Sequence, residues 1–143
     1  MSNIALKIGV AVSKEKALAA VNTLQGLAGW WTWDVSGDPG EGGTLAFRFH
    51  GQGPDMKVLS TTDHSVHWQC IAGPEEWLDT EIKFTIKDEG ETAIYFQHLN
   101  WKDESGFYAL CSMKWATFML SMKQYLEHGS GHPFPDDIQI NTL

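Results

Sequence analysis

The sequence predicts an α+β domain in which an antiparallel sheet is covered by one long C-terminal helix. Apolar side chains between about Asp103 and His128 recur at the i, i+3, i+4, i+7 spacing of a single helical face. Upstream, several short segments alternate apolar and polar residues, as half-buried strands do, and the turns between them are short enough for antiparallel hairpins. A sheet with one apolar face and a helix with one apolar stripe must cover each other in water.

The N-terminal part of the chain is predicted to contain one strand and two short helices. Apolar residues alternate over residues 4–12, which indicates a first strand with one buried face. Ser13 is a suitable N-cap for a helix over residues 14–21, whose composition favours helix formation. A second short helix is predicted over Thr23–Ala28, and we expect Gly29 to end it.

A loop and a series of strands are expected next. Glycine and proline dominate residues 36–43, which predicts the clearest loop in the chain. About five antiparallel strands follow, because alternating segments are separated by turn residues. The alternating segments are Leu45–Phe49, Met56–Val58, Val66–Cys70, Ile82–Ile86 and Ile94–His98. Strands and helices that are segregated in this way are typical of an α+β fold and not of a parallel α/β fold.

The predicted C-terminal helix carries unusually large apolar side chains on one face. Its stripe consists of Phe107, Leu110, Cys111, Trp115, Phe118, Met119, Met122, Tyr125 and Leu126. We expect the helix to stop at Gly129, since glycine is favoured just after a helix end, and two prolines shortly afterwards prevent a restart. The chain is therefore expected to form one domain over residues 1–133, followed by a C-terminal tail over residues 134–143.

Composition restricts the possible partners and location. The chain has 143 residues and a formal net charge of −8, from 18 acidic and 10 basic residues. This charge argues against nucleic acid and membrane surfaces as partners, because phosphate-rich partners need a basic face. No apolar run approaches the roughly 20 residues of a membrane span, and the N-terminus lacks the pattern of a signal peptide. Because Cys70 and Cys111 are isolated in apolar contexts, we expect buried free thiols and a cytoplasmic protein.

No sequence pattern predicts a metal site, a cofactor or a catalytic nucleophile. Six histidines are present, but His64 and His67 are three residues apart on a predicted strand and therefore point to opposite faces. The metal-binding patterns His-Glu-x-x-His and Cys-x-x-Cys do not occur, and neither do the nucleophile elbow or the phosphate loop. We therefore assign no catalytic residue, no metal ligand and no cofactor, and we favour a protein that is not an enzyme.

His98 is the polar residue whose position is most informative. It shares a strand face with Ile94 and Phe96, the face that is expected to meet the long helix. One interpretation is a core histidine that is hydrogen-bonded within the protein. The other is a polar anchor in an apolar pocket, as small-molecule sites commonly have.

Several local segments, taken in their order along the chain, resemble a known superfamily. They include Trp30-Trp31 after the two short helices, and Gly42-Gly43 before Phe47-Arg48-Phe49. Further on come Val66-His67-Trp68, Trp77 before Thr80–Phe84, Phe96-Gln97-His98 leading to Trp101, Cys111–Trp115 and Tyr125–Gly129. These segments resemble the SRPBCC superfamily of START-like and Bet v-like proteins. Within it they are most similar to the homologues of the heat-shock chaperone (Hsp) ATPase activator, over roughly residues 3–133.

The resemblance implies a helix-grip fold with a ligand cavity. In this fold a curved antiparallel sheet wraps around a long C-terminal helix, with two short helices after the first strand. Members of the superfamily bind lipids, hormones or polyketides, so the implied function is binding of a small apolar or amphipathic molecule. Two alternatives stay open: a cyclase, dehydratase or hydrolase of an aromatic polyketide-like substrate in the same cavity, and a co-chaperone-like interaction module. The chain is compatible with either a monomer or a homodimer.

Strand parity and the helical stripe indicate which residues would surround such a cavity. We predict a wall of large apolar side chains with a mouth near the paired tryptophans. The predicted ligand-binding residues are Trp30, Trp31, Phe49, Trp68, Phe84, Phe96, His98, Trp101, Trp115, Phe118, Met119 and Met122. The competing interpretation is a solid core without a void, because protein interiors are normally close-packed.

Overall fold

A computed structural model describes residues 1–141, which form the predicted α+β arrangement of strands and helices. In chain order the elements are β1 (Ser2–Val10), α1 (Lys14–Asn22), α2 (Leu24–Trp30), β2 (Asp34–Gly37), β3 (Thr44–Arg48), β4 (Asp55–Thr61), β5 (Ser65–Ala72), the 3-10 turn η1 (Glu75–Trp77), β6 (Glu81–Asp88), β7 (Thr92–Trp101) and α3 (Gly106–His128). The order agrees with the sequence prediction of a strand, two short helices, a run of strands and a final long helix.

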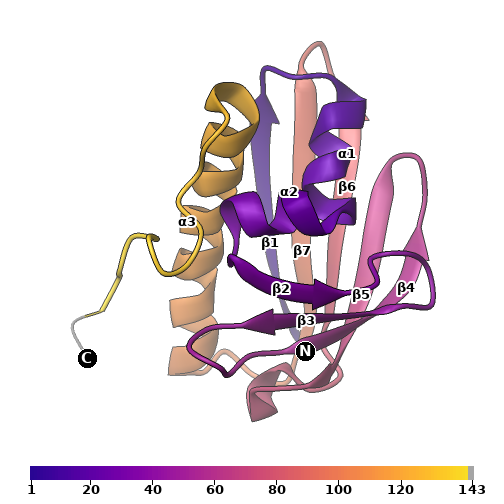
Figure 1. Ribbon diagram of the computed structural model, residues 1–143. Helices are drawn as coiled ribbons and strands as arrows, with labels where there is room; N and C mark the ends of the chain where they lie inside the picture. The colour runs from indigo at the N-terminus through magenta and orange to yellow at the C-terminus, as the bar shows by residue number, and fades with distance from the viewer. Residues whose placement is uncertain (142–143) are drawn as a thin grey trace.

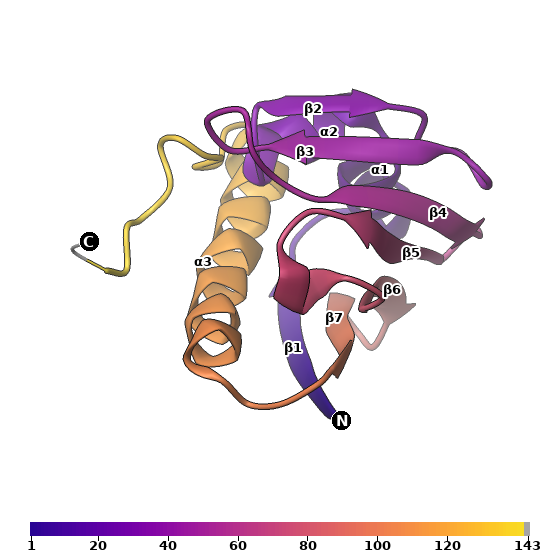
Figure 2. The ribbon, with the colours of Figure 1, turned by 90° about the horizontal axis from the view of Figure 1, so that it is seen from below.

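The strands form one antiparallel sheet of seven strands in the order β1-β7-β6-β5-β4-β3-β2. Figure 2 shows that this sheet is curved and that α3 lies against its concave side. Helices α1 and α2 lie on the same side of the sheet, beside α3 (Figure 1). This is the helix-grip arrangement, and it confirms that the apolar helix stripe and the apolar sheet face cover each other.

The two short helices begin as predicted, but the second one ends later than predicted. Ser13 caps α1 by accepting a hydrogen bond from the Lys16 backbone N–H at 3.1 Å. Helix α2 continues through Gly29 to Trp30, so the predicted end at Gly29 is wrong. A β-carbon at Gly29 would lie 2.3 Å from the ring of Tyr125 on α3. The glycine permits the close approach of two helices and does not break one.

The loop predicted over residues 36–43 starts later than expected, because Asp34–Gly37 form strand β2. This strand pairs with β3 and places Val35 opposite Phe47. It lies at the edge of the sheet and most of its side chains are exposed, so no alternation of apolar residues marks it in the sequence.

Helix α3 begins at Gly106, slightly after the predicted start at Asp103, and it stops where predicted. Its N-cap is Ser105, whose hydroxyl oxygen accepts a hydrogen bond from the Tyr108 N–H at 3.3 Å. At the other end Gly129 has a φ of 88°, a left-handed conformation that glycine adopts without strain. None of the helices formed by residues 1–141 is long and apolar enough to cross a bilayer.

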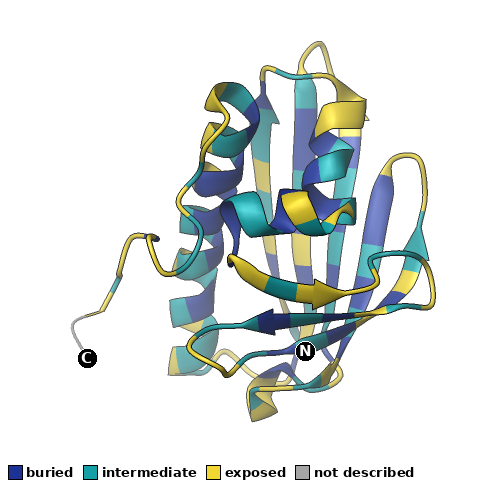
Figure 3. Cartoon of the chain, viewed as in Figure 1, coloured by how far each residue is buried: buried dark blue, intermediate teal, exposed yellow. Residues whose placement is uncertain are grey.

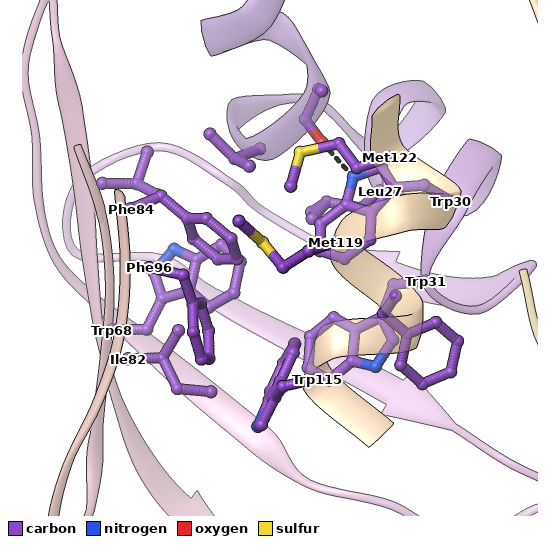
Figure 4. Packing of buried hydrophobic residues seen from close by; sticks show 14 of the residues in the cluster. Leu27, Trp30, Trp31, Trp68, Ile82, Phe84, Phe96, Trp115, Met119 and Met122 are labelled. Carbon is purple, nitrogen blue, oxygen red and sulfur yellow. Dashed lines mark hydrogen bonds between the residues drawn. The ribbon is translucent and has the colours of Figure 1, made fainter. Parts of the chain in front are cut away.

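Aromatic rings fill the space between α3 and the sheet. Buried residues alternate along the strands and follow one side of α3 (Figure 3). The ring of Trp115 on α3 lies 4.4 Å from that of Phe96 on β7 and 4.8 Å from that of Trp31. Trp31 packs in turn at 4.2 Å from the ring of Phe47 on β3. Met119 points into the middle of this layer and is only 3% exposed (Figure 4). The helix therefore meets the sheet through a continuous layer of rings.

His98 on β7 is fully buried, and both of its ring nitrogens are hydrogen-bonded within the protein. The Trp115 indole N–H donates to His98 Nδ1 at 3.1 Å, and His98 Nε2–H donates to the Thr80 hydroxyl at 2.9 Å. The Thr80 hydroxyl donates to the Trp77 carbonyl at 2.6 Å. This pattern suits a neutral imidazole, and burial lowers the pKa of His98 to about 3. The network ties α3 to β7 and η1.

The predicted C-terminal tail docks beside α3 over its first residues. The Phe134 N–H donates to the Trp31 carbonyl at 2.8 Å, and the Phe134 ring lies 5.1 Å from the ring of Phe49. Further along, Asp137 forms an ion pair with Lys114 of α3, and the residues up to 141 then run outward beside this helix (Figures 1 and 2). The last two positions of the predicted tail, 142 and 143, lie outside the described residues.

Replacing Met119 by tryptophan is expected to destabilise the protein by roughly 1–3 kcal/mol, because the larger ring would overpack a filled core. Urea unfolding monitored by circular dichroism measures the change. The control is Ile71→Trp on strand β5, where Ile71 is 48% exposed. It should alter the free energy of unfolding by no more than about 0.5 kcal/mol. Equal stabilities of Met119→Trp and the wild type would reveal unfilled space at this position.

The free energy of unfolding is expected to fall as the pH drops from about 6.5 towards 3, partly because of His98. Its pKa is about 3 in the fold and ordinary in the unfolded chain, so acid protonates only the unfolded form. Above about pH 6.5 His98 is neutral in both states and has no effect on the pH dependence of unfolding. Below that pH it lowers the free energy of unfolding by at most about 1.4 kcal/mol per pH unit. Urea titrations between about pH 4.5 and 6.5 should show a shallower slope for His98→Gln than for the wild type.

The control for this pH experiment is His128→Gln, which removes an exposed imidazole at the end of α3. It should leave the slope of unfolding free energy against pH closer to that of the wild type than His98→Gln does. Identical slopes for the two variants would contradict the assigned role of His98.

Candidate functional site

A pocket of about 380 Å³ opens between α3, the turn that joins β3 to β4, and the segment that leads into η1. This volume lies in the range of roughly 300–1,000 Å³ that is usual for small-molecule sites. The pocket wall is mostly apolar. Its aromatic members are Trp31, Phe49, Trp77, Phe107, Trp115, Phe118 and Phe134. The pocket can therefore surround a ligand with rings from several elements.

Helix α3 supplies one complete side of the pocket. Phe107, Cys111, Lys114, Trp115 and Phe118 all line it. They are spaced three or four residues apart, so they project from the same face of the helix. This face continues the apolar stripe that packs on the sheet, but near the start of the helix the stripe borders open space instead of a filled core.

The opposite side is formed by the turn between β3 and β4, which Arg48 holds in place. Its guanidinium donates to the carbonyls of Gly53 at 3.2 Å and Pro54 at 3.3 Å, and it forms an ion pair with Asp55 at 2.7 Å. Gly53 and Pro54 line the pocket. The arginine therefore supports this wall through hydrogen bonds from β3 to the turn.

Two charged residues, Lys114 and Asp137, lie on the pocket wall and form an ion pair. The Asp137 side chain is only 3% exposed, whereas that of Lys114 is 26% exposed. The Lys114 ammonium also donates to the Ile138 carbonyl at 2.6 Å and lies 5.3 Å from the centre of the Phe118 ring. Neither carboxylate oxygen of Asp137 has a well-aligned hydrogen bond among the described residues. The pair is therefore held mainly by charge.

Cys111 lies on the pocket wall and is mostly buried. Burial raises the pKa of its thiol to about 11. At neutral pH this side chain is an apolar thiol that contributes to the shape of the pocket, not a thiolate nucleophile.

The structure brings some of the predicted ligand-binding residues to this pocket and places the others in the closed core. Those that line the pocket are Trp31, Phe49, Trp115 and Phe118. Those that lie in the core and do not line the pocket are Trp30, Trp68, Phe84, Phe96, His98, Trp101, Met119 and Met122. The paired tryptophans differ in this respect, because Trp31 borders the pocket and Trp30 stacks behind it with ring centroids 6.0 Å apart. Exposure alone does not separate the two groups, since Trp31 and Trp115 are each only 2% exposed.

Other wall residues were not among the predicted ligand-binding residues. They are Gln52, Gly53, Pro54, Pro74, Trp77, Phe107, Cys111, Lys114, Phe134, Asp137 and Gln139. Phe107 and Cys111 belong to the predicted apolar stripe of the helix, so following that stripe towards its start would have identified them. Phe134 and Asp137 come from the tail, where no periodic pattern indicates which way a side chain faces.

Metal-ligating side chains do not gather at this pocket or elsewhere in the described part of the chain. Among residues 1–141, no group of three or more His, Cys, Asp or Glu side chains is placed to hold a metal ion.

No protein-family model matches the chain, and no curated protein matches it. Comparison with solved structures, in contrast, finds proteins of similar fold. The fold is similar to that of protein SSP2350 from Staphylococcus saprophyticus, with 18% identity, a TM-score of 0.74, and coverage of 91% of this chain and 95% of that one. It is also similar to CalU16 from Micromonospora echinospora, with 16% identity, a TM-score of 0.74, and coverage of 93% and 69%. At these identities the likeness extends to the fold alone.

One solved structure is much more similar in sequence. The Aha1 dimer from Colwellia psychrerythraea matches with 45% identity and a TM-score of 0.83, and the match covers 92% of this chain and 100% of that one. The fold is therefore shared over most of this chain with a relative of nearly equal length. On this similarity the chain belongs to the Aha1 family, homologues of the activator of Hsp90 ATPase, as the sequence resemblance implied.

Proposed function

We propose that the protein binds a small apolar molecule in the pocket between α3 and the β3–β4 side of the sheet. The observation that carries this proposal is the concentration of aromatic rings around a space that they do not fill. Apolar surface left in contact with water is costly, at roughly 25 cal/mol per Å², so a ligand that displaces water from these rings gains binding energy. The remainder of the space between helix and sheet is a closed core, which leaves this pocket as the natural site.

The pocket also has features that would orient a ligand. The half-buried rings of Phe49 and Phe134 lie 5.1 Å apart with planes inclined at 68°, so they present two differently oriented surfaces. Aromatic molecules pack well in stacked or edge-to-face contact with such rings. Side-chain amides of Gln52 and Gln139 add hydrogen-bonding groups at the wall. A flat aromatic molecule with few polar groups would fit this environment.

We also propose that the protein forms a homodimer, as the relative from Colwellia psychrerythraea is described to do. Apolar side chains on the outer side of α3 support this. Met113 and Leu120 are 59% and 56% exposed, and their spacing of two helical turns puts them on one face. Burial of these side chains against a second copy would remove them from water.

A fluorescent probe tests the ligand site. N-phenyl-1-naphthylamine, a neutral aromatic dye, is expected to bind the wild type and increase in fluorescence. Cys111→Phe should weaken this binding by about tenfold or more, because the added ring fills part of the pocket. The control Cys111→Ala removes the thiol without filling the space and should bind the dye like the wild type.

Two results would contradict the proposed ligand site. One is a wild-type protein that does not bind the dye, and the other is a folded Cys111→Phe variant that binds it equally well. Circular dichroism of each variant establishes that it is folded. Native mass spectrometry of freshly purified protein would then reveal the mass of any molecule that co-purifies.

The dimer is tested by light scattering coupled to size-exclusion chromatography. The wild type is expected to elute as a dimer, and Leu120→Glu should shift it towards the monomer, because a carboxylate would be buried at the interface. The matched control is Ile71→Glu on strand β5, where Ile71 is 48% exposed. That variant should remain dimeric. A monomeric wild type, or a Leu120→Glu variant that stays dimeric, would rule out this interface.

A further inference from the structure

The C-terminal tail forms part of the pocket wall. Phe134, Asp137 and Gln139 all line the pocket, although they lie beyond the last helix. Phe134 is held by backbone hydrogen bonds to the chain around Trp31, with an N–H to carbonyl distance of 2.8 Å. From Asp137 onwards the tail contacts the body through Lys114, by the ion pair and the bond to the Ile138 carbonyl. The outer part of this wall therefore depends on one lysine.

The Asp137 carboxylate occupies an unusual environment for a charged group. Its side chain is 3% exposed, and its oxygens lack well-aligned hydrogen bonds among the described residues. A buried ion pair of this kind contributes little net stability, because the loss of hydration offsets most of the attraction. Released into water, the carboxylate would regain its hydration. The cost of exchanging it for another anion on Lys114 is therefore small.

Lys114 would stay attractive to an anion after such a release. Its ammonium is held beside the Phe118 ring at 5.3 Å, and no other positively charged side chain of residues 1–141 lines the pocket. The net charge of the chain is −8, so the protein as a whole repels anions. Salt screens that long-range repulsion over about 10 Å at 0.1 M, whereas a direct contact with the ammonium is screened much less. Anion binding would therefore be local to Lys114.

We propose that the pocket takes an aromatic molecule with one anionic group, and that this group replaces the Asp137 carboxylate on Lys114. The inference rests on the proposed binding function and adds the chemical class of the ligand. The rings of the pocket would hold the aromatic part, and the lysine would pair with the carboxylate or sulfonate. The tail then acts as a built-in competitor: it covers Lys114 in the empty protein and is displaced from Asp137 onwards by the ligand.

Two dyes with the same rings test this proposal. 1-Anilinonaphthalene-8-sulfonate carries a sulfonate, and N-phenyl-1-naphthylamine is its uncharged counterpart. Asp137→Asn removes the competing charge while keeping the shape of the side chain. It should lower the Kd of the sulfonate dye by about tenfold, the scale of one charge-assisted hydrogen bond, and change the Kd of the neutral dye by less than about twofold. Fluorescence titration at 0.1 M salt gives both values.

Two further variants isolate the role of the lysine. Asp136→Asn removes the same charge from the neighbouring exposed residue, which does not line the pocket, and should leave both Kd values unchanged. In the double variant Lys114→Met/Asp137→Asn the preference for the sulfonate dye should disappear. This double variant leaves no unpaired charge in the wall, so it carries the test even if Lys114→Met alone does not fold.

The possible results separate this proposal from the binding function itself. Failure of the wild type to bind the neutral dye rejects the pocket as a ligand site and rejects this proposal with it. If the neutral dye binds, three results overturn the proposal alone: an unchanged Kd for the sulfonate dye in Asp137→Asn, equal gains for both dyes, or a sulfonate preference that persists in the double variant. Equal gains would mean that the tail covers the pocket without competing for Lys114.

Discussion

The burial of aromatic rings between α3 and the concave face of the sheet is the interaction on which the rest of this structure depends. Trp115 is central to it, because its ring contacts Phe96 of the sheet and Trp31 of the segment after α2. Its indole N–H also needs an acceptor in the dry core, and His98 provides one. Apolar burial therefore holds the helix on the sheet, while a buried hydrogen bond from Trp115 connects it to β7.

The pocket follows from the same geometry. A straight helix can stay in close contact with a curved sheet over only part of its length. Around Met119 the rings interdigitate and the core is filled, whereas around Phe107 and Cys111 the helix face borders the turn between β3 and β4 and leaves space. Core and pocket are thus two parts of one apolar surface, and they differ in whether the opposite wall is near enough to fill the gap.

Within residues 1–141, the charged groups of the pocket wall are confined to the ion pair between Lys114 and Asp137. The chain is strongly acidic, yet among the described residues the positive charge on the wall of this apolar pocket belongs to Lys114, and the tail supplies the carboxylate that neutralises it. Segments with few buried contacts open at a lower free energy than the core does. Residues 137–141 form such a segment, since they are mostly exposed apart from Asp137, whereas Phe134 is attached by a backbone hydrogen bond to Trp31 and by a ring contact with Phe49. The tail residues beyond Phe134 can therefore leave the pocket wall while the sheet stays unchanged.

The sequence by itself determined the features that depend on near neighbours: the order of strands and helices, the caps at Ser13 and Gly129, and the face of α3 that is buried. These follow from periodicity and local hydrogen bonding, which a sequence contains directly. Only the tertiary structure decided that α2 runs through Gly29, because the reason is the Tyr125 ring on a distant helix. It also decided that His98 bonds to Trp115 and Thr80, and that Asp137 meets Lys114. The pocket belongs to this second group, since whether an apolar stripe meets a filled core or an open space depends on the curvature of the sheet and the path of the tail.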